Sequence, residues 1–163
     1  MPSLRKTPGY RALRAGRVSE AGRAYLITTV THRRERWFSS FAAGCFMSRR
    51  IAAADAWPGA DIHAWVLMPD HIHVLLSLTG STRLPALLNS FKGRSAFAFN
   101  RWRGRSGPLW LDGFHDRAVR REESLADVAR YIIANPVRAG LAGGVAGYPF
   151  WDCEWTGPEG IGV

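Results

Sequence analysis

Apolar residues recur along the chain at spacings that predict alternating strands and helices. Residues 24–31 (AYLITTVT) are β-branched and aromatic, which predicts a strand. A helix is expected to begin at Ser39 or Ser40 as its N-cap and to run towards Trp57. The Pro58-Gly59 pair then ends it, because neither residue supports a helix interior.

A hairpin and a second helix are predicted in the middle of the chain. Residues 62–68 and 71–78 are two apolar, β-branched runs joined by the short turn Pro69-Asp70, which indicates a tight antiparallel hairpin. From Leu84 to about Arg101 the apolar residues follow helical spacing. The basic residues 101–108 after it contain glycine and proline and predict a loop.

The last third of the chain predicts one more strand and one more helix. Residues 115–121 are expected to form the strand, and Ser124 caps a helix with Asp127 three residues further on. The order β, α, β, β, α, β, α is typical of an α+β, ferredoxin-like fold, in which helices pack on an antiparallel sheet. We therefore expect a basic N-terminal arm (1–23), one folded domain (24–150) and a C-terminal tail (151–163).

The charge of the chain points to a polyanionic partner. Its 163 residues fit one domain and carry a formal net charge of +9, from 22 basic and 13 acidic side chains. Lys6 and Lys92 are the only lysines, and arginine binds phosphate bidentately and stacks on bases. A GC-rich genome explains the preference for arginine over lysine, but it does not explain the excess of positive charge. Nucleic acid is therefore favoured over a membrane surface.

Cysteine usage and hydropathy indicate a cytoplasmic, nucleoid-associated protein. Cys45 and Cys153 are far apart and lack the spacing of a disulfide framework or a zinc knuckle. No apolar run approaches the roughly 20 residues of a membrane-spanning helix. No apolar signal region follows the basic N-terminus, so we expect no association with a membrane.

Two histidines stand at the start of the second hairpin strand. Side chains alternate between the faces of a strand, so His71 and His73 point to the same side. The other face carries Ile72, Val74 and further apolar residues and suits the core. Two imidazoles at this spacing can bind one metal ion, although two unrelated surface histidines give the same pattern.

Tyr131 and Asn135 lie one helical turn apart on the flank of the last helix. Leu125, Val128, Ala129, Ile132 and Ile133 form its apolar stripe. On periodicity alone, Tyr131 is a packing residue with its hydroxyl in water, and Asn135 ends the helix before Pro136. The combination with the histidines suggests another interpretation, in which the tyrosine attacks a phosphodiester near a metal that neutralises the phosphate. A His, His and amide-oxygen site suits Mn²⁺ and accepts Mg²⁺.

Two segments of the chain resemble a known family. Residues 68–73 (MPDHIH) are similar to the His-hydrophobic-His signature of HUH transposases. Residues 131–141 (YIIANPVRAGL) resemble the tyrosine-helix signature of the REP-associated tyrosine transposases. Further agreement comes from residues 16–19, 107–110 and 148–152, so that the likeness runs from about residue 10 to 155.

The resemblance implies a ferredoxin-like HUH domain that cleaves and rejoins single-stranded DNA. Its targets would be hairpins formed by repetitive extragenic palindromes, and its cofactor would be Mg²⁺ or Mn²⁺. By family role, Tyr131 is the nucleophile that forms a 5′-phosphotyrosine, and His71, His73 and Asn135 are the metal ligands. Asp70 stands where many relatives have Asn, and we assign it to the turn. The resemblance also implies a monomer, not the helix-exchanging dimer of related insertion-sequence transposases.

The arginines supply candidate contacts to the DNA backbone, and two tryptophans among them could stack on unpaired bases. For Trp110, core packing is an equal alternative. The candidates are Arg14, Arg17, Lys92, Arg94, Arg101, Trp102, Arg103, Arg105, Trp110, Arg117, Arg120, Arg121 and Arg138.

Two other functions compete with strand transfer. A binding module could retain the fold and the basic surface without catalysis and act on hairpin DNA or RNA. A metal-dependent hydrolase could use the histidines while Tyr131 stays structural, but no carboxylates cluster beside the histidines in the sequence. A covalent adduct between protein and DNA distinguishes strand transfer from both alternatives.

Overall fold

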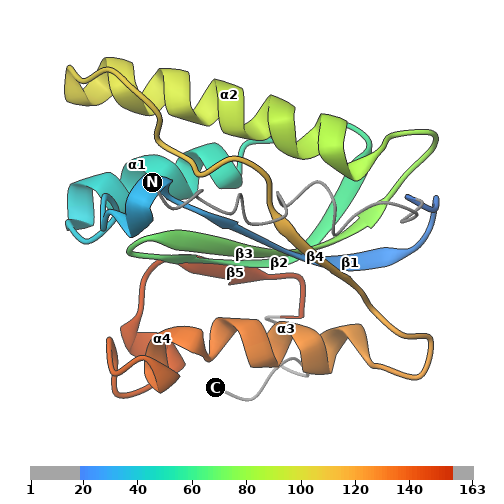
Figure 1. Ribbon diagram of the computed structural model, residues 1–163. Coiled ribbons are helices and arrows are strands. Elements are labelled where there is room, and N and C mark those ends of the chain that lie inside the picture. Colours follow the sequence, from blue (N-terminus) through green and yellow to red (C-terminus); the bar gives the residue numbers. More distant parts are fainter. Residues whose placement is uncertain (1–18, 156–163) are drawn as a thin grey trace, which may run out of the picture.

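The computed structural model describes residues 19–155, which are built around a five-stranded antiparallel sheet in the order β4-β1-β3-β2-β5 (Figure 1). The strands are β1 (Ala24–Val30), β2 (Ala60–Met68), β3 (His71–Leu78), β4 (His115–Ala118) and β5 (Trp151–Cys153). The helices are η2 (His32–Arg34), α1 (Phe41–Ile51), α2 (Leu84–Arg103), α3 (Leu125–Ile133), α4 (Asn135–Arg138) and η3 (Val145–Gly147). The predicted α+β, ferredoxin-like class is confirmed by this arrangement.

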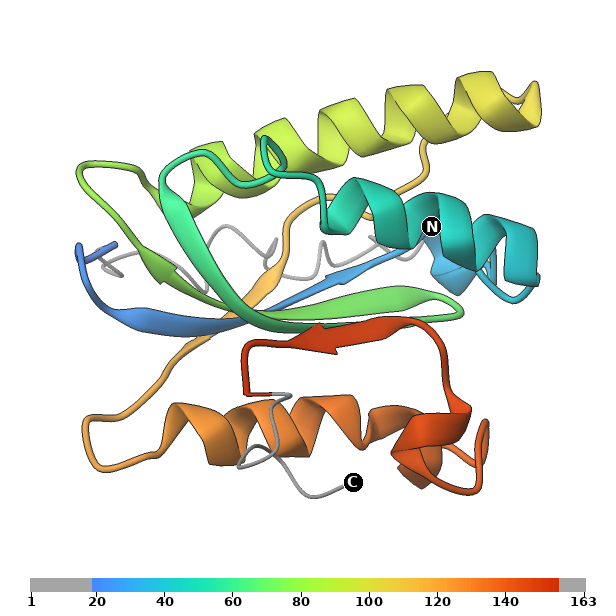
Figure 2. The ribbon, with the colours of Figure 1, turned by 180° about the vertical axis from the view of Figure 1, so that it is seen from behind.

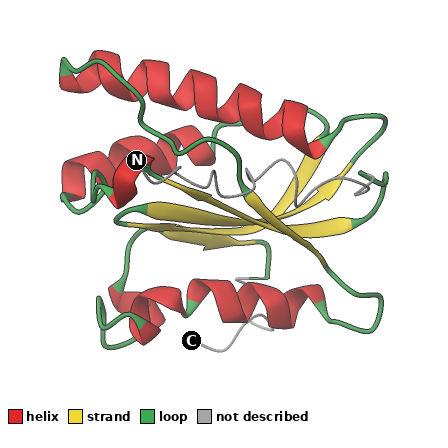
Figure 3. Ribbon diagram, in the orientation of Figure 1, coloured by secondary structure: helices red, strands yellow, loops and turns green. Residues whose placement is uncertain are grey.

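The helices form two layers, one on each face of the sheet. Helices α1 and α2 cover one face, and α3 and α4 lie against the other (Figures 1 and 2). Figure 3 shows the same helix–sheet–helix layers by type of structure. The strands thus have one face under α1 and α2 and the other under α3, which suits the largely apolar strand sequences.

The predicted hairpin positions the histidines at one end of the sheet. β2 and β3 pair antiparallel from Ala60↔Leu78 to Met68↔His71, and Pro69-Asp70 forms the turn. Ile72 and Val74 are buried on the face of α1 and α2, as the alternation of the strand predicted. His71 and His73 are only partly buried and share the opposite face of β3, on which α3 packs.

Helix α1 is shorter than the sequence pattern predicted. Ser40 caps it, with its hydroxyl accepting from Ala43 N at 3.2 Å, but the helix ends at Ile51 and not near Trp57. The Trp57 indole donates to the carbonyl of Ile51 at 2.9 Å and stacks on Phe91, with ring centroids 4.2 Å apart. Trp57 therefore satisfies a carbonyl at the end of the helix and anchors the following loop in the core.

The two edge strands also differ from the sequence prediction. β4 ends at Ala118 and not at residue 121, and Val119 N continues the pairing by donating to the carbonyl of Ala24, at the start of β1, at 2.9 Å. β5 lies within the segment 151–163 expected to be a tail, and it pairs with Ala64–Val66 of β2. The sheet therefore extends past residue 150, the boundary that we placed from the sequence.

The tyrosine-bearing helix begins as its sequence predicted, but it ends before Asn135, which we placed from the sequence on the same helix as Tyr131. Ser124 is the N-cap of α3 and accepts from Asp127 N at 3.4 Å. The apolar stripe of α3 faces the sheet, with Val128, Ala129, Ile132 and Ile133 buried. The helix ends at Ile133, and the separate turn α4 follows from Asn135. Within residues 19–155, no helix combines the length and the hydropathy needed to cross a membrane.

Candidate active site

The two histidine rings of β3 lie next to each other. Their centroids are 4.9 Å apart and the ring planes are nearly perpendicular, at 83°. This proximity follows from the strand, because residues two apart project from the same face. The pair is thus close enough for both rings to bind one ion.

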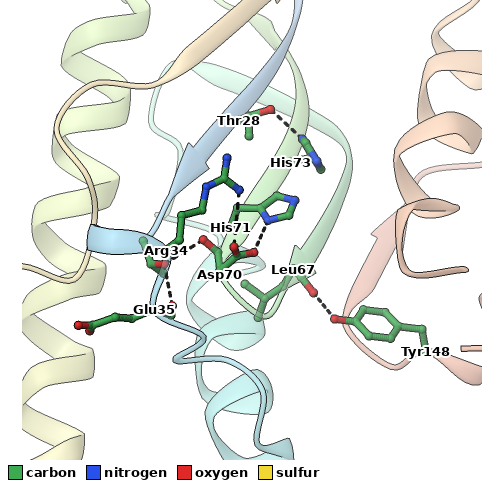
Figure 4. A network of polar contacts seen from close by, with 9 residues as sticks. Thr28, Arg34, Glu35, Leu67, Asp70, His71, His73 and Tyr148 are labelled. Atoms are coloured by element: carbon green, nitrogen blue, oxygen red, sulfur yellow. Dashed lines mark hydrogen bonds and ion pairs between the residues drawn. The ribbon is translucent and has the colours of Figure 1, made fainter. Parts of the chain in front are cut away.

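Each ring has its Nδ1 atom held by a neighbouring side chain (Figure 4). His71 Nδ1 donates to Asp70 Oδ1 at 2.6 Å, and His73 Nδ1 is hydrogen bonded to Thr28 Oγ1 at 2.7 Å. Thr28 lies opposite His73 in the register of β1 and β3. Because a carboxylate only accepts, Nδ1 of His71 carries a proton, and in the neutral form of the ring Nε2 then has the lone pair that a metal needs.

Asp70 also forms an ion pair with Arg34, which follows β1. Arg34 Nη1 lies 3.6 Å from Asp70 Oδ2, and the backbone carbonyl of Asp70 accepts from Thr31 Oγ1 at 3.0 Å. Burial raises the pKa of Asp70, but the hydrogen bond and charge of His71, together with Arg34, lower it below its ordinary value. Asp70 therefore stays ionised and orients His71.

The environment of His73 keeps its imidazole neutral. Burial, together with the positive charges of His71 and Arg138, lowers its pKa to about 3. A neutral imidazole has a lone pair available for a metal, whereas a protonated one does not. Arg138 belongs to α4, the turn that follows the tyrosine-bearing helix.

Arg138 connects Tyr131 to Asn135. Its Nη2 donates to the carbonyl of Tyr131 and to Asn135 Oδ1, both at 2.7 Å. Its guanidinium carbon lies 4.1 Å from the centroid of the Tyr131 ring, a cation–π distance. The Tyr131 side chain is 62% exposed, so an incoming strand can reach its hydroxyl.

The donor atoms present suit a divalent metal bound jointly by protein and substrate. Within residues 19–155, no group of three or more His, Cys, Asp or Glu side chains is arranged to hold a metal ion. Two imidazole nitrogens therefore need further oxygen donors, which an amide such as Asn135 and the phosphate can supply. Asn135 Oδ1 already accepts from Arg138 and has a second lone pair for a ligand bond.

Several of the residues predicted to contact DNA stabilise the protein itself. Lys92 Nζ donates to the carbonyls of Leu111 and Gly113, and Arg94 Nη2 donates to those of Asp55 and Ala56. The prediction that Trp110 stacks on bases is wrong: it is 5% exposed and donates to Ser95 Oγ from within the core.

Other predicted contacts lie on the surface and stay predictions. Trp102 is 42% exposed, but it stacks on Phe46 at 4.6 Å. Arg105 lies over the Trp37 ring, and Arg117 pairs with Glu123. Arg101, Arg103, Arg120, Arg121 and Arg138 are exposed, while Arg14 and Arg17 lie outside the described residues.

Two residues that hold the histidine rings were not predicted to do so from the sequence. Thr28 is found only when the register of β1 against β3 is known. The carboxylate of Asp70 was assigned to the turn, yet it also holds His71. For Arg138 the signal was present, since it lies three residues after Asn135 and thus on the same face of a helical turn.

Comparisons with known proteins agree with this fold. The family model described as "Transposase IS200 like" matches residues 21–135, more than half of the chain. The chain therefore belongs to the IS200-like transposase family.

Two individual proteins are also similar to this chain. A Haemophilus influenzae protein named "Putative REP-associated tyrosine transposase" is 27% identical over 139 residues, covering 79% of this chain and 78% of that protein. A solved REP-associated tyrosine transposase, bound to a REP hairpin, superposes with a TM-score of 0.65 at 23% identity. The superposition covers 83% of this chain and 79% of the solved chain, and it supports a shared fold.

Proposed function

We propose that this protein cleaves and rejoins single-stranded DNA at hairpins of repetitive extragenic palindromes, through a 5′-phosphotyrosine on Tyr131. Family membership supports transposase chemistry, and the relative solved with a REP hairpin supports the class of substrate. The basic surface of the chain, with its net charge of +9, suits a phosphate backbone.

One observation carries the proposal: Arg138 joins the two halves of the site. It contacts both Tyr131 and Asn135, and its charge lowers the pKa of His73. The same chain supplies the tyrosine helix α3 and the histidine strand β3 against which it packs, so the proposal needs no exchange of helices between two copies. We expect a monomer to be active.

In the proposed reaction, Tyr131 Oη attacks the phosphorus of a phosphodiester. The bond from phosphorus to the 3′-oxygen breaks, and that oxygen leaves as a 3′-hydroxyl after taking up a proton. The phenol loses its proton to water, which the exposure of the side chain allows. The 5′ end stays on the tyrosine, which stores the bond for rejoining when a 3′-hydroxyl attacks in the reverse direction.

The metal proposed for this site is Mg²⁺ or Mn²⁺, which His71 and His73 would hold through Nε2 and Asn135 through Oδ1. Its chemistry, when it is bound, is to neutralise negative charge on the phosphate oxygens as the transition state forms. Asp70 and Thr28 orient the two rings, and the low pKa of His73 keeps its nitrogen available. Arg138 orients Asn135 and contributes a positive charge beside Tyr131.

The test is covalent capture of DNA. Labelled single-stranded hairpin DNA is incubated with the wild-type protein or with Tyr131→Phe, with Mg²⁺, with Mn²⁺ or with a chelator, and run on denaturing gels. We expect a metal-dependent protein–DNA adduct and a free 3′-hydroxyl fragment with wild type only. Equal cleavage by both proteins would contradict the assigned nucleophile, and binding without cleavage under any metal would contradict catalysis.

A further inference from the structure

A surface cavity of about 530 Å³ adjoins Tyr131 on α3. Leu26 of β1 and Val128 of α3 form its apolar part, and Tyr131 borders it. Val128 precedes Tyr131 by three residues, so both project from neighbouring positions of the helix. The phenol of the proposed nucleophile is therefore a wall of this cavity.

The rim of the cavity is polar and carries carboxylates. Arg117 Nη1 binds both oxygens of Glu123, at 2.9 and 2.8 Å, and Glu123 Oε2 also accepts from Arg120 N at 2.7 Å. These three bonds fix the Glu123 side of the rim. Asp127 lies further along α3, where one oxygen accepts from Arg130 at 2.6 Å and the other has a free lone pair for a ligand donor.

We propose that this cavity binds the base of a nucleotide that flanks the phosphodiester attacked by Tyr131. The inference rests on the proposed function, because it needs the phosphate at Tyr131. A base next to that phosphate is joined to it through one sugar, and Tyr131 itself lines the cavity. Its volume lies in the range of about 300 to 1,000 Å³ typical of small-molecule sites.

The chemistry of the lining selects among bases. Leu26 and Val128 offer an apolar surface to the flat face of a base, which any base satisfies. The carboxylates of Asp127 and the neighbouring Glu122 only accept hydrogen bonds. They favour bases with an exocyclic amino group, which are cytosine, adenine and guanine, over thymine, which has none.

Binding is tested without cleavage, in the Tyr131→Phe background. The fluorescent base 2-aminopurine is placed in turn at each unpaired position beside a DNA hairpin, and its emission is measured with and without protein. We expect the protein to change the emission strongly at one position only. Leu26→Trp, which fills the cavity, and Leu26→Ala, which removes its apolar contact, should both reduce that change at least about threefold. Leu111→Trp, at a 48% exposed leucine outside the cavity, is the matched control and should leave it unchanged.

Cleavage then tests the position and the preference. In otherwise wild-type protein, an abasic nucleotide at the fluorescent position should lower kcat/KM for adduct formation about tenfold or more, as expected for loss of one stacked base. DNA with thymine at that position should be cleaved more slowly than DNA with cytosine. In the double variant Asp127→Asn and Glu122→Gln, the kcat/KM values for the two substrates should lie within about twofold of each other.

The outcomes separate this inference from the proposed function. The base site would be overturned if adducts formed equally well on abasic and intact DNA and if Leu26→Trp did not alter the 2-aminopurine emission. That result would leave the assignment of Tyr131 as the nucleophile in place. No adduct on any substrate would overturn the proposed function. The proposal that the base flanks the attacked phosphodiester would be contradicted if the position whose emission depends on Leu26 lay far from the mapped cleavage point.

Discussion

Tyr131 and Tyr148 are the same side chain in two opposite environments. Tyr148, between η3 and β5, is 9% exposed, and its hydroxyl donates to the carbonyl of Leu67 at 2.6 Å (Figure 4). Burial raises its pKa to about 12. Tyr131 is 62% exposed, lies under the guanidinium of Arg138 and borders a cavity.

The difference shows what separates a structural tyrosine from a candidate nucleophile. Tyr148 uses its hydroxyl to hold the C-terminal segment on the end of β2, and burial favours its neutral form. Tyr131 leaves its hydroxyl accessible and has a cation against its ring. Exposure and a nearby positive charge, more than residue type, thus mark Tyr131 as the candidate nucleophile.

The largest contrast is expected from removing each hydroxyl in turn. Tyr131→Phe should lower adduct formation by at least about 10³-fold, the scale of removing a catalytic nucleophile, and leave the free energy of unfolding nearly unchanged. Tyr148→Phe should retain adduct formation. Single-turnover rates and urea unfolding of both variants measure the two effects, and a cleavage defect of similar size in both would break the comparison.

The histidines give the next largest contrast. His73→Ala should lower cleavage by more than about 100-fold, beyond the range for residues that merely support a ligand. The control is His63→Ala: both ring nitrogens of His63 are bonded within the protein, to Glu154 at 2.9 Å and to Ser77 at 2.7 Å. Cleavage rates at saturating Mn²⁺ compare the two, and an equal loss would argue against a metal at His73.

A smaller effect is expected from Arg138. Arg138→Gln should lower cleavage about tenfold, because Asn135 loses its orienting hydrogen bond and Tyr131 loses the adjacent charge. Mn²⁺ affinity, measured by calorimetry, should fall with it, and Arg138→Lys should recover part of the rate. Arg49→Gln, at an exposed arginine on α1, is the control. Unchanged Mn²⁺ affinity in Arg138→Gln would mean that Asn135 does not bind metal.

The smallest effect concerns Tyr148 and pH. Its pKa is about 12 in the folded protein and near 10 when unfolded, so between these values only the unfolded chain loses the proton. Stability is therefore fully present below pH 10 and falls as pH rises towards 12. Tyr148→Phe should lower the free energy of unfolding by about 1 kcal/mol at pH 7. Its free energy of unfolding should also fall less steeply at alkaline pH, as measured by urea unfolding from pH 8 to 12. An identical alkaline slope in both proteins would contradict the role of Tyr148.

Local periodicity predicted the parts of the site that depend on one element. Strand alternation correctly put His71 and His73 on one face and Ile72 and Val74 in the core. The cap at Ser124 was also predictable, because capping is a local interaction.

Features that depend on partners distant in sequence were not predictable. Thr28 meets His73 only through the register of β1 and β3, and β5 exists only because β2 offers it an edge. The early end of α1 depends on where the Trp57 indole docks. Trp110 had two interpretations in the sequence, and only its burial decided between them. Tertiary contacts, in each case, override the local pattern.

The most direct test of the central claim is to find which residue carries the DNA. The sequence contains four tyrosines, and adducts formed on hairpin DNA can be digested with nuclease and protease and mapped by mass spectrometry. We predict a nucleotide phosphate on the peptide containing Tyr131 and on no other tyrosine. A modification on Tyr10, Tyr25 or Tyr148, or cleaved DNA with free 5′-phosphate ends and no modified peptide, would contradict the account.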